Sequence, residues 1–202
     1  MLRASEPRTS RRDLLARALV PGAALAGGLT LFARRPHAAG AAPSQAQDRA
    51  IFNYALLLEY LQAAFYAEAV DRGALSGEVR EFAEVVAGHE RAHVAFLRGA
   101  LGSQAHAKPK FTFRDATRDE RKFLDAAVLL ENTGVAAYNG QAANLTKKAL
   151  AVAAEIVSVE GRHAAWISDL AGKAPAPRAA DPGAPPNEVI RTLKRTGFLG
   201  RS

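Results

Sequence analysis

The sequence predicts an all-α protein: a four-helix bundle with a long crossover between its second and third helices, plus a short C-terminal helix. Gly and Pro gather in a few short segments, and the long stretches between them are rich in Ala, Leu, Val and Glu. A repeated Glu-x-x-His pattern also indicates helices, because positions i and i+3 share one helix face. With 202 residues, 49% of them hydrophobic, the chain is long enough for one domain with a substantial core.

The composition excludes several classes of protein. The chain has no cysteine, so disulfides, zinc fingers, iron–sulfur clusters and thiol catalysis are all excluded. Its formal charge is +7, but seven arginines lie within residues 1–41, where only Glu6 and Asp13 are acidic. The remainder has 20 basic and 18 acidic residues, a net charge of +2. Basicity therefore gives no support to a nucleic-acid partner.

Residues 1–41 have the features of a signal peptide. The pair Arg11 and Arg12 precedes a moderately apolar run, Leu14–Ala33, and small residues follow it. A charged region, an apolar region and an Ala-x-Ala-type site predict removal of this segment, with cleavage after Ala41.

The paired arginines resemble a twin-arginine export signal, which predicts a periplasmic or other extracytoplasmic location. Ala16 stands where a basic residue is usual in that signal. An amphipathic leader and an uncleaved membrane anchor are the alternatives. The twin-arginine route carries folded proteins, so it permits metal loading before export, and no membrane association is expected after cleavage.

The rest of the chain is expected to form the bundle over residues 42–172 and a Pro- and Ala-rich tail over residues 173–202. Val189, Ile190 and Leu193 share one face of the last helix. We expect this helix to pack as a lid on the end of the bundle rather than to bind a partner. The first expected helix starts at residue 45 or 48 and ends at residue 70. The other expected helices span residues 76–101, 117–144, 146–171 and 187–196.

Cap residues set the expected helix starts. Thr117 and Glu120 match the Ser/Thr-x-x-Glu capping box at the start of the third helix. Ser76, Thr146 and Asn187 are the expected N-caps of the second, fourth and fifth helices.

Residues 102–116 form the predicted crossover, in which Pro109 prevents a helix. Fifteen residues can span up to about 50 Å. A helix of 25 residues is about 37 Å long, so this connection can run the length of the bundle. The third helix can therefore start at the opposite end from the end of the second.

Two helical hairpins carry the same pattern: a lone Glu in an apolar run, then Glu-x-x-His at separations of 31 and 29 residues. An ionised carboxylate in such a core costs several kcal/mol unless it is paired or bound to a metal. Four carboxylates together would repel one another without two divalent cations. Carboxylate and imidazole ligands without thiolate favour two Fe ions, or alternatively two Mn ions. The predicted ligands of this dimetal site are Glu59, Glu90, His93, Glu131, Glu160 and His163.

Three further polar residues lie near the predicted ligands. Tyr66 and Tyr138 each follow the lone Glu of their hairpin by seven positions. They are either core residues with satisfied hydroxyls, or hydrogen-bonding or redox-active phenols beside the metals. Gln62 holds the i+3 position that His occupies on the second and fourth helices, as a polar filler or as a partner of metal-bound water.

Other candidate residues have weaker signals. His89 is expected at a helix interface or next to the ligands, and His106 is expected to be exposed in the crossover. His37 lies in the leader. Gly134 and Gly161 lie within helices, where each costs about 1 kcal/mol relative to Ala. Either close helix approach or room for a small oxidant would explain them.

The segments that carry these residues resemble the ferritin-like superfamily, and within it the exported ferritin-like domain family related to plant desiccation-associated proteins. The resemblance implies a ferritin-like four-helix bundle with a dimetal centre, in which Glu90 and Glu160 do part of the bridging. A rubredoxin module is not matched, because the chain has no Cys. The resemblance covers roughly residues 48–171 and is carried by residues 53–61, 89–97, 130–135 and 159–166.

The superfamily includes ferroxidases, peroxidases, catalases and oxygenases, so the fold alone does not choose the reaction. The leading hypothesis is a redox metalloprotein whose two metal ions react with O2 or H2O2, in iron oxidation or peroxide defence. The alternative is a non-enzymatic, metal-binding or stress-protective bundle. Export and the small net charge disfavour a DNA-protecting iron cage. Metal ions and a small oxidant are the expected partners, and a homo-oligomer is compatible with the sequence.

Replacing both arginines of the predicted export signal, Arg11→Lys with Arg12→Lys, is expected to abolish export, because the twin-arginine route depends on this pair. Cell fractionation and immunoblotting measure the outcome. Arg8→Lys, which alters another arginine of the same segment, is the control. Unchanged export of the double variant would contradict the prediction.

Overall fold

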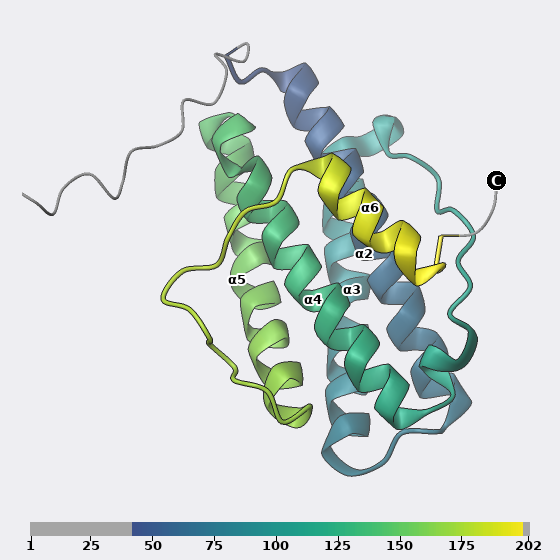
Figure 1. Cartoon of the computed structure of the whole chain (residues 1–202). Coiled ribbons are helices and arrows are strands. Elements are labelled where there is room, and N and C mark those ends of the chain that lie inside the picture. Colours follow the sequence, from purple (N-terminus) through teal and green to yellow (C-terminus); the bar gives the residue numbers. More distant parts are fainter. Residues whose placement is uncertain (1–41, 200–202) are drawn as a thin grey trace, which may run out of the picture. The chain divides into compact units, whose positions relative to one another are not determined.

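The computed structural model describes residues 42–199, which form an all-α bundle (Figure 1). The predicted leader lies outside the described residues and stays a prediction. Within the described part of the chain, no helix combines the length and the apolar character needed to cross a membrane. The helices are α2 (Gln45–Arg72), α3 (Gly77–Leu101), α4 (Glu120–Gln141), α5 (Lys147–Leu170) and α6 (Pro186–Thr196).

The four long helices form two antiparallel hairpins, α2 with α3 and α4 with α5 (Figure 1). The crossover runs down the side of the bundle, so α3 and α4 point in the same direction, as its length predicted. Asn53 of α2 holds the first turn of the crossover in place. Its side-chain amide donates to Gln104 O at 3.0 Å, and its Oδ1 accepts from His106 N at 2.8 Å. The all-α fold with a short C-terminal helix is confirmed.

The start of α4 differs from the prediction, because Thr117 and Glu120 do not form a capping box. Asp119 is the N-cap, and its side chain accepts from a backbone amide one turn later at 2.9 Å. Thr117 is buried in the preceding 3₁₀ turn and donates to Glu68 Oε1 at 2.8 Å. Glu120 instead accepts hydrogen bonds from Ser76 N at 2.7 Å and Ser76 Oγ at 2.9 Å. This contact ties the start of α4 to the start of α3.

Two other helix ends also differ. Pro185, rather than Asn187, occupies the N-cap of α6. The proline that follows it suits the first turn, because the amide that proline lacks would have no partner there. The α-helical part of α4 ends at Gln141 instead of Asn144, since the last residues tighten into a 3₁₀ turn. Thr146 caps α5 as predicted.

The C-terminal helix α6 lies along the flank of the bundle against α4, so the predicted lid on the bundle end is wrong (Figure 1). Ahead of this helix, Ala184 N donates to Ala136 O of α4 at 2.8 Å. Val189 and Leu193 then enter the bundle core, 2% and 1% exposed. The tail can lie close because Gly140 of α4 presents no side chain to it.

The hydrophobic core has two parts, an aromatic part centred on stacked and edge-on rings and a mostly aliphatic part. Phe65 lies at the centre of the aromatic part, with its ring centroid 5.3 Å from Phe123, 5.4 Å from Phe113 and 6.1 Å from Phe198. These rings join α2, α4, the crossover and the C-terminal segment. The aliphatic part is built around Leu56, Leu97, Ile156 and their neighbours. The predicted metal ligands lie in the helix turns between the two parts.

Gly140→Ala is expected to lower the free energy of unfolding by about 1–3 kcal/mol, because the new Cβ would overlap the backbone of Ala184. Gly161→Ala is the matched control within a helix, since a Cβ there meets nothing within 4 Å. This control is expected to raise stability by up to about 1 kcal/mol. Urea unfolding measures both, and equal effects of the same sign would contradict the packing argument.

Candidate metal centre

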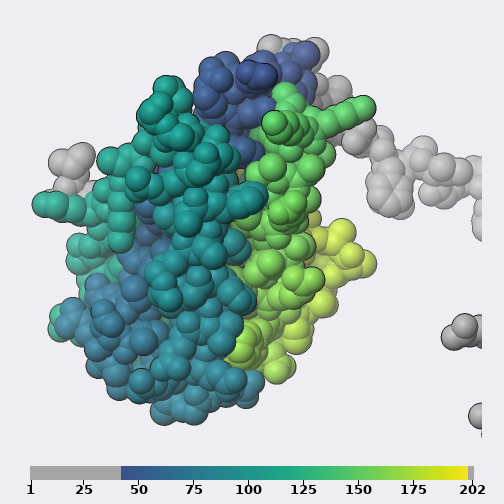
Figure 2. All heavy atoms as spheres, turned by 180° about the vertical axis from the view of Figure 1, so that it is seen from behind, coloured from purple at the N-terminus to yellow at the C-terminus, as the bar shows by residue number. Residues whose placement is uncertain are grey.

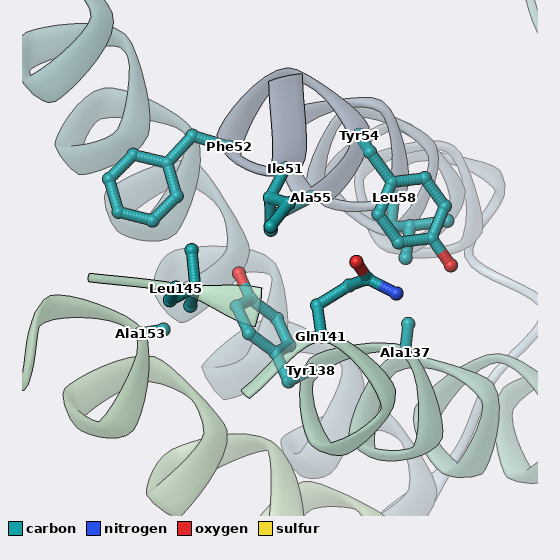
Figure 3. Close-up of a pocket in the computed structure, with 10 residues that line it drawn as sticks. All are labelled: Ile51, Phe52, Tyr54, Ala55, Leu58, Ala137, Tyr138, Gln141, Leu145 and Ala153. Carbon is teal, nitrogen blue, oxygen red and sulfur yellow. The ribbon is translucent and has the colours of Figure 1, made fainter. Parts of the chain in front are cut away.

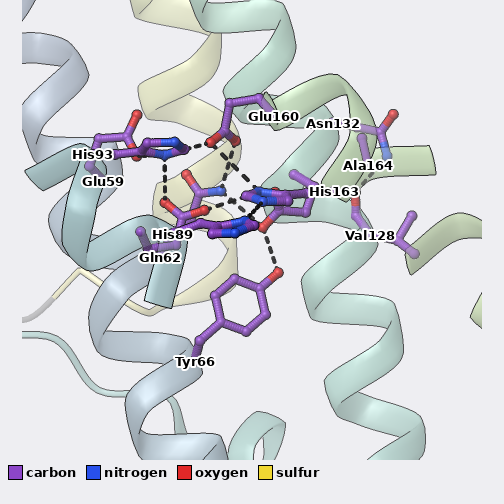
Figure 4. Close-up of polar contacts among 12 residues, drawn as sticks. Glu59, Gln62, Tyr66, His89, His93, Val128, Asn132, Glu160, His163 and Ala164 are labelled. Atoms are coloured by element: carbon purple, nitrogen blue, oxygen red, sulfur yellow. Dashed lines mark hydrogen bonds and ion pairs between the residues drawn. The ribbon is translucent and has the colours of Figure 1, made fainter. Parts of the chain in front are cut away.

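The six predicted ligands come together in the middle of the bundle. Figure 4 labels Glu59, His93, Glu160 and His163 among them. Each Glu-x-x-His pair projects from one helix face, because its members are three residues apart. The four carboxylates are at most 1% exposed, and the imidazoles are 8% and 3% exposed. Their sources are Glu59 of α2, Glu90 and His93 of α3, Glu131 of α4, and Glu160 and His163 of α5.

The ligand atoms form two groups that share two carboxylates. The His93 position consists of Glu59, Glu90, Glu160 and His93, and the His163 position of Glu90, Glu131, Glu160 and His163. Within each group one ligand atom from every residue lies within 4.8 Å of the others. Glu90 and Glu160 belong to both groups, so they are placed to bridge two cations. That these six residues bind metal stays a prediction.

The hydrogen bonding of the cluster fits divalent cations. Both imidazoles turn Nδ1 towards three carboxylate oxygens at 3.1–3.8 Å. In the described part of the chain, eight buried side-chain N and O atoms have no hydrogen-bond partner, and seven are inward-facing atoms of this cluster. Buried polar atoms normally have partners. One cation in each group would give these seven atoms a ligand role.

Protons balance part of this buried charge when no cation is bound. Burial, followed by the charge of Glu59, raises the pKa of Glu90 well above its usual range. Burial, followed by the charge of Glu90, also raises the pKa of Glu160 well above its usual range. Burial alone would lower the pKa of His93, but its three carboxylate neighbours outweigh it and raise the pKa to about 12. Cations would replace these protons.

Tyrosines hold the outer oxygens of the two lone glutamates. Tyr138 of α4 donates to Glu59 Oε1, and Tyr66 of α2 donates to Glu131 Oε1, each at 2.5 Å (Figure 4 shows the second). Each tyrosine therefore bonds to the glutamate of the opposite hairpin. Burial, followed by the charge of its glutamate partner, raises the pKa of both phenols well above 10.0, so both remain protonated donors.

Gln62 also contacts the cluster. Its Nε2 donates to Glu131 Oε1 at 3.0 Å and lies 3.5 Å from Glu160 Oε2. Gly134 occupies the equivalent position of the second hairpin, where a Cβ would lie 3.1 Å from Glu160 Oε2. The close approach of the Glu160 side chain therefore explains the glycine at position 134. It does not explain Gly161, where a Cβ meets nothing within 4 Å.

His89 lies next to a ligand: its Nδ1 is 2.8 Å from Nε2 of His163. The sequence left this role open, although the i,i+4 spacing of His89 and His93 places both on one helix face. His106, by contrast, is exposed in the crossover, as expected. Burial and the neighbouring His163 lower the pKa of His89, so the ring is neutral and can accept a hydrogen bond.

A surface hollow of about 370 Å³ borders the cluster between α3 and α5. Figure 2 views the side of the bundle on which these two helices face outwards. His89, His93 and His163 line the hollow together with Val85, Val159 and Trp166. Because the imidazoles are more exposed than the carboxylates, solvent comes closest to the cluster here.

A second, much smaller cavity lies beside Tyr138 (Figure 3). Its volume is about 10 Å³, which is room for about one water molecule. Phe52, Leu58 and Ala153 contribute to its apolar wall, and Gln141 is its amide-bearing neighbour. This cavity is too small for an organic substrate.

A comparison with protein families matches the ferritin-like domain over residues 47–173, more than half of the chain. The chain belongs to the ferritin-like domain family. The comparison with curated proteins found no relative. The ferritin-like fold expected from the sequence is therefore confirmed, whereas the exported, desiccation-related branch stays a prediction.

In this ferritin-like bundle, Tyr66→Phe and Tyr138→Phe are each expected to lower the free energy of unfolding by about 1–3 kcal/mol, because each leaves a buried carboxylate oxygen with one donor fewer. Tyr54→Phe is the matched control, since its buried hydroxyl has no partner among the described residues. That change should leave stability equal or higher. Urea unfolding of the metal-free variants measures all three, and an equal loss in Tyr54→Phe would contradict the assignment.

Proposed function

We propose that the chain binds two Fe ions in this cluster, with two Mn ions as the alternative, and that the pair reacts with O2 or H2O2. The role would be iron oxidation or peroxide defence. The observation that carries the proposal is the sharing of buried Glu90 and Glu160 by two groups of ligand atoms. Membership of the ferritin-like family supports it. The absence of thiolate ligands favours Fe or Mn.

When bound, such a pair of ions would supply the redox chemistry with O2 or H2O2. The protein's part is to position and enclose. Tyr66 and Tyr138 fix the outer oxygens of Glu131 and Glu59, so the inner oxygens, which have no hydrogen-bond partner, would be the ones to hold a cation. The aromatic core on one side and the aliphatic core on the other limit access by water. The hollow beside the imidazoles is the side from which a molecule as small as O2 or H2O2 would approach.

Export belongs to the same proposal. The twin-arginine-type leader supports an extracytoplasmic site of action, since that route permits a protein to leave the cytoplasm already folded and metal-loaded. A bundle that binds the same metals without turnover, for storage or protection, is the alternative function. It would use the same ligands.

The purified mature chain is expected to contain two Fe or two Mn per chain, and Glu90→Ala with Glu160→Ala is expected to abolish binding at both positions, because both residues are shared. Elemental analysis and the optical spectrum measure this. Glu81→Ala with Glu155→Ala, two exposed carboxylates of the same helices, is the matched control. Unchanged metal content in the Glu90/Glu160 variant would refute the site.

Peroxide and O2 consumption by the metal-loaded chain then separates the two functions. Turnover that is lost in the Glu90/Glu160 variant and kept in the Glu81/Glu155 control supports the redox function. Two metals per chain with no turnover of peroxide, O2 or Fe²⁺ would contradict it and favour the non-enzymatic alternative.

A further inference from the structure

The two metal positions have matching ligands but different surroundings. Superposing the hairpins along the sequence pairs Glu59 with Glu131 and His93 with His163. Counting four positions back from each histidine pairs His89 with Val159, and counting three positions on from each glutamate pairs Gln62 with Gly134. In each of these last two pairs only one hairpin has a polar side chain. Both polar side chains contact the His163 position (Figure 4).

The contact of His89 fixes the ring of His163. For Nδ1 of His163 to bind a cation, its proton must lie on Nε2. That Nε2–H can then donate to Nδ1 of His89, 2.8 Å away. The hydrogen bond selects the metal-binding tautomer, orients the ring and raises its basicity. His89 is not placed as a ligand itself, because its Nδ1 faces His163.

His93 lacks this support. In the described residues, no side chain is hydrogen-bonded to its Nε2, and its Nδ1 faces the carboxylates. Val159, the counterpart of His89, lines the same hollow as His93 but has no polar side-chain atom. The ring of His93 therefore depends on solvent for an outer partner.

The lone glutamates also differ in the number of hydrogen bonds they accept, and the difference again favours the His163 position. Glu131 Oε1 accepts from both Tyr66 and Gln62, whereas Glu59 Oε1 accepts from Tyr138 alone among the described side chains. A glycine at position 134 explains the difference, because it provides no counterpart to the Gln62 amide. The His163 position is thus the better oriented of the two.

We propose that His89 is a positioning residue that makes the His163 position the tighter of the two metal sites, so that a divalent cation fills it first. This inference depends on the proposed metal-binding function. Removing an outer partner of a metal-bound histidine typically lowers affinity by about 10- to 100-fold. The two binding steps should differ by about that factor.

The test places His89→Val in two backgrounds, each of which keeps one histidine ligand. In His93→Ala, where the His163 position is complete, His89→Val should weaken Co²⁺ binding by about 10- to 100-fold. In His163→Ala, where the His93 position is complete, the same change should alter affinity by less than about twofold, because His89 has no contact there. Titration followed by the visible absorption of bound Co²⁺ measures each affinity, and circular dichroism confirms folding.

His89→Asn provides a rescue, since its carbonyl oxygen can accept a hydrogen bond close to where Nδ1 does. It should retain more affinity than His89→Val in the His93→Ala background. Equal losses in both backgrounds, or no loss in His93→Ala, would overturn the role of His89 while the metal site itself stands. If the unmodified chain binds no Co²⁺, Fe²⁺ or Mn²⁺, the proposed function and this inference fail together.

Discussion

The burial of four carboxylates at the centre of one bundle is the constraint on which the rest of the structure depends. Each would cost several kcal/mol in an apolar core unless its charge were balanced. The chain meets this cost with two imidazoles, two phenols and one amide, all directed at the same layer. The inward atoms that remain without hydrogen-bond partners are those that two cations would use.

This layer also joins the two hairpins. Tyr66 of the first reaches Glu131 of the second, and Tyr138 of the second reaches Glu59 of the first. These two bonds set the register of α2 against α4. The contacts of His93 with Glu160 at 3.1 Å and of His163 with Glu90 at 3.2 Å do the same for α3 against α5. A displaced donor in this polar layer would leave a buried carboxylate unsatisfied, so the layer holds the hairpins in one register.

The sequence predicts the parts of the fold that depend on local periodicity. Four helices and the convergence of six polar residues follow from i,i+3 spacing inside apolar runs. Contacts between distant segments were not predictable in this way. Glu120 matched a capping box, yet it bonds to Ser76, and Thr117 bonds to Glu68. The partner of His89 lies 74 residues away, so neither its neighbours nor its helix face identified it.

The differences between the hairpins carry more information than their likeness. Two shared carboxylates, one lone glutamate and one histidine at each position offer cations the same donors. The side-chain contacts that distinguish the positions come from Gln62 and His89, and both support the His163 position. His89 also lines the hollow where solvent comes closest to the imidazoles. The residue that we propose to order the tighter position therefore also lines the surface by which solvent comes closest to the ligands.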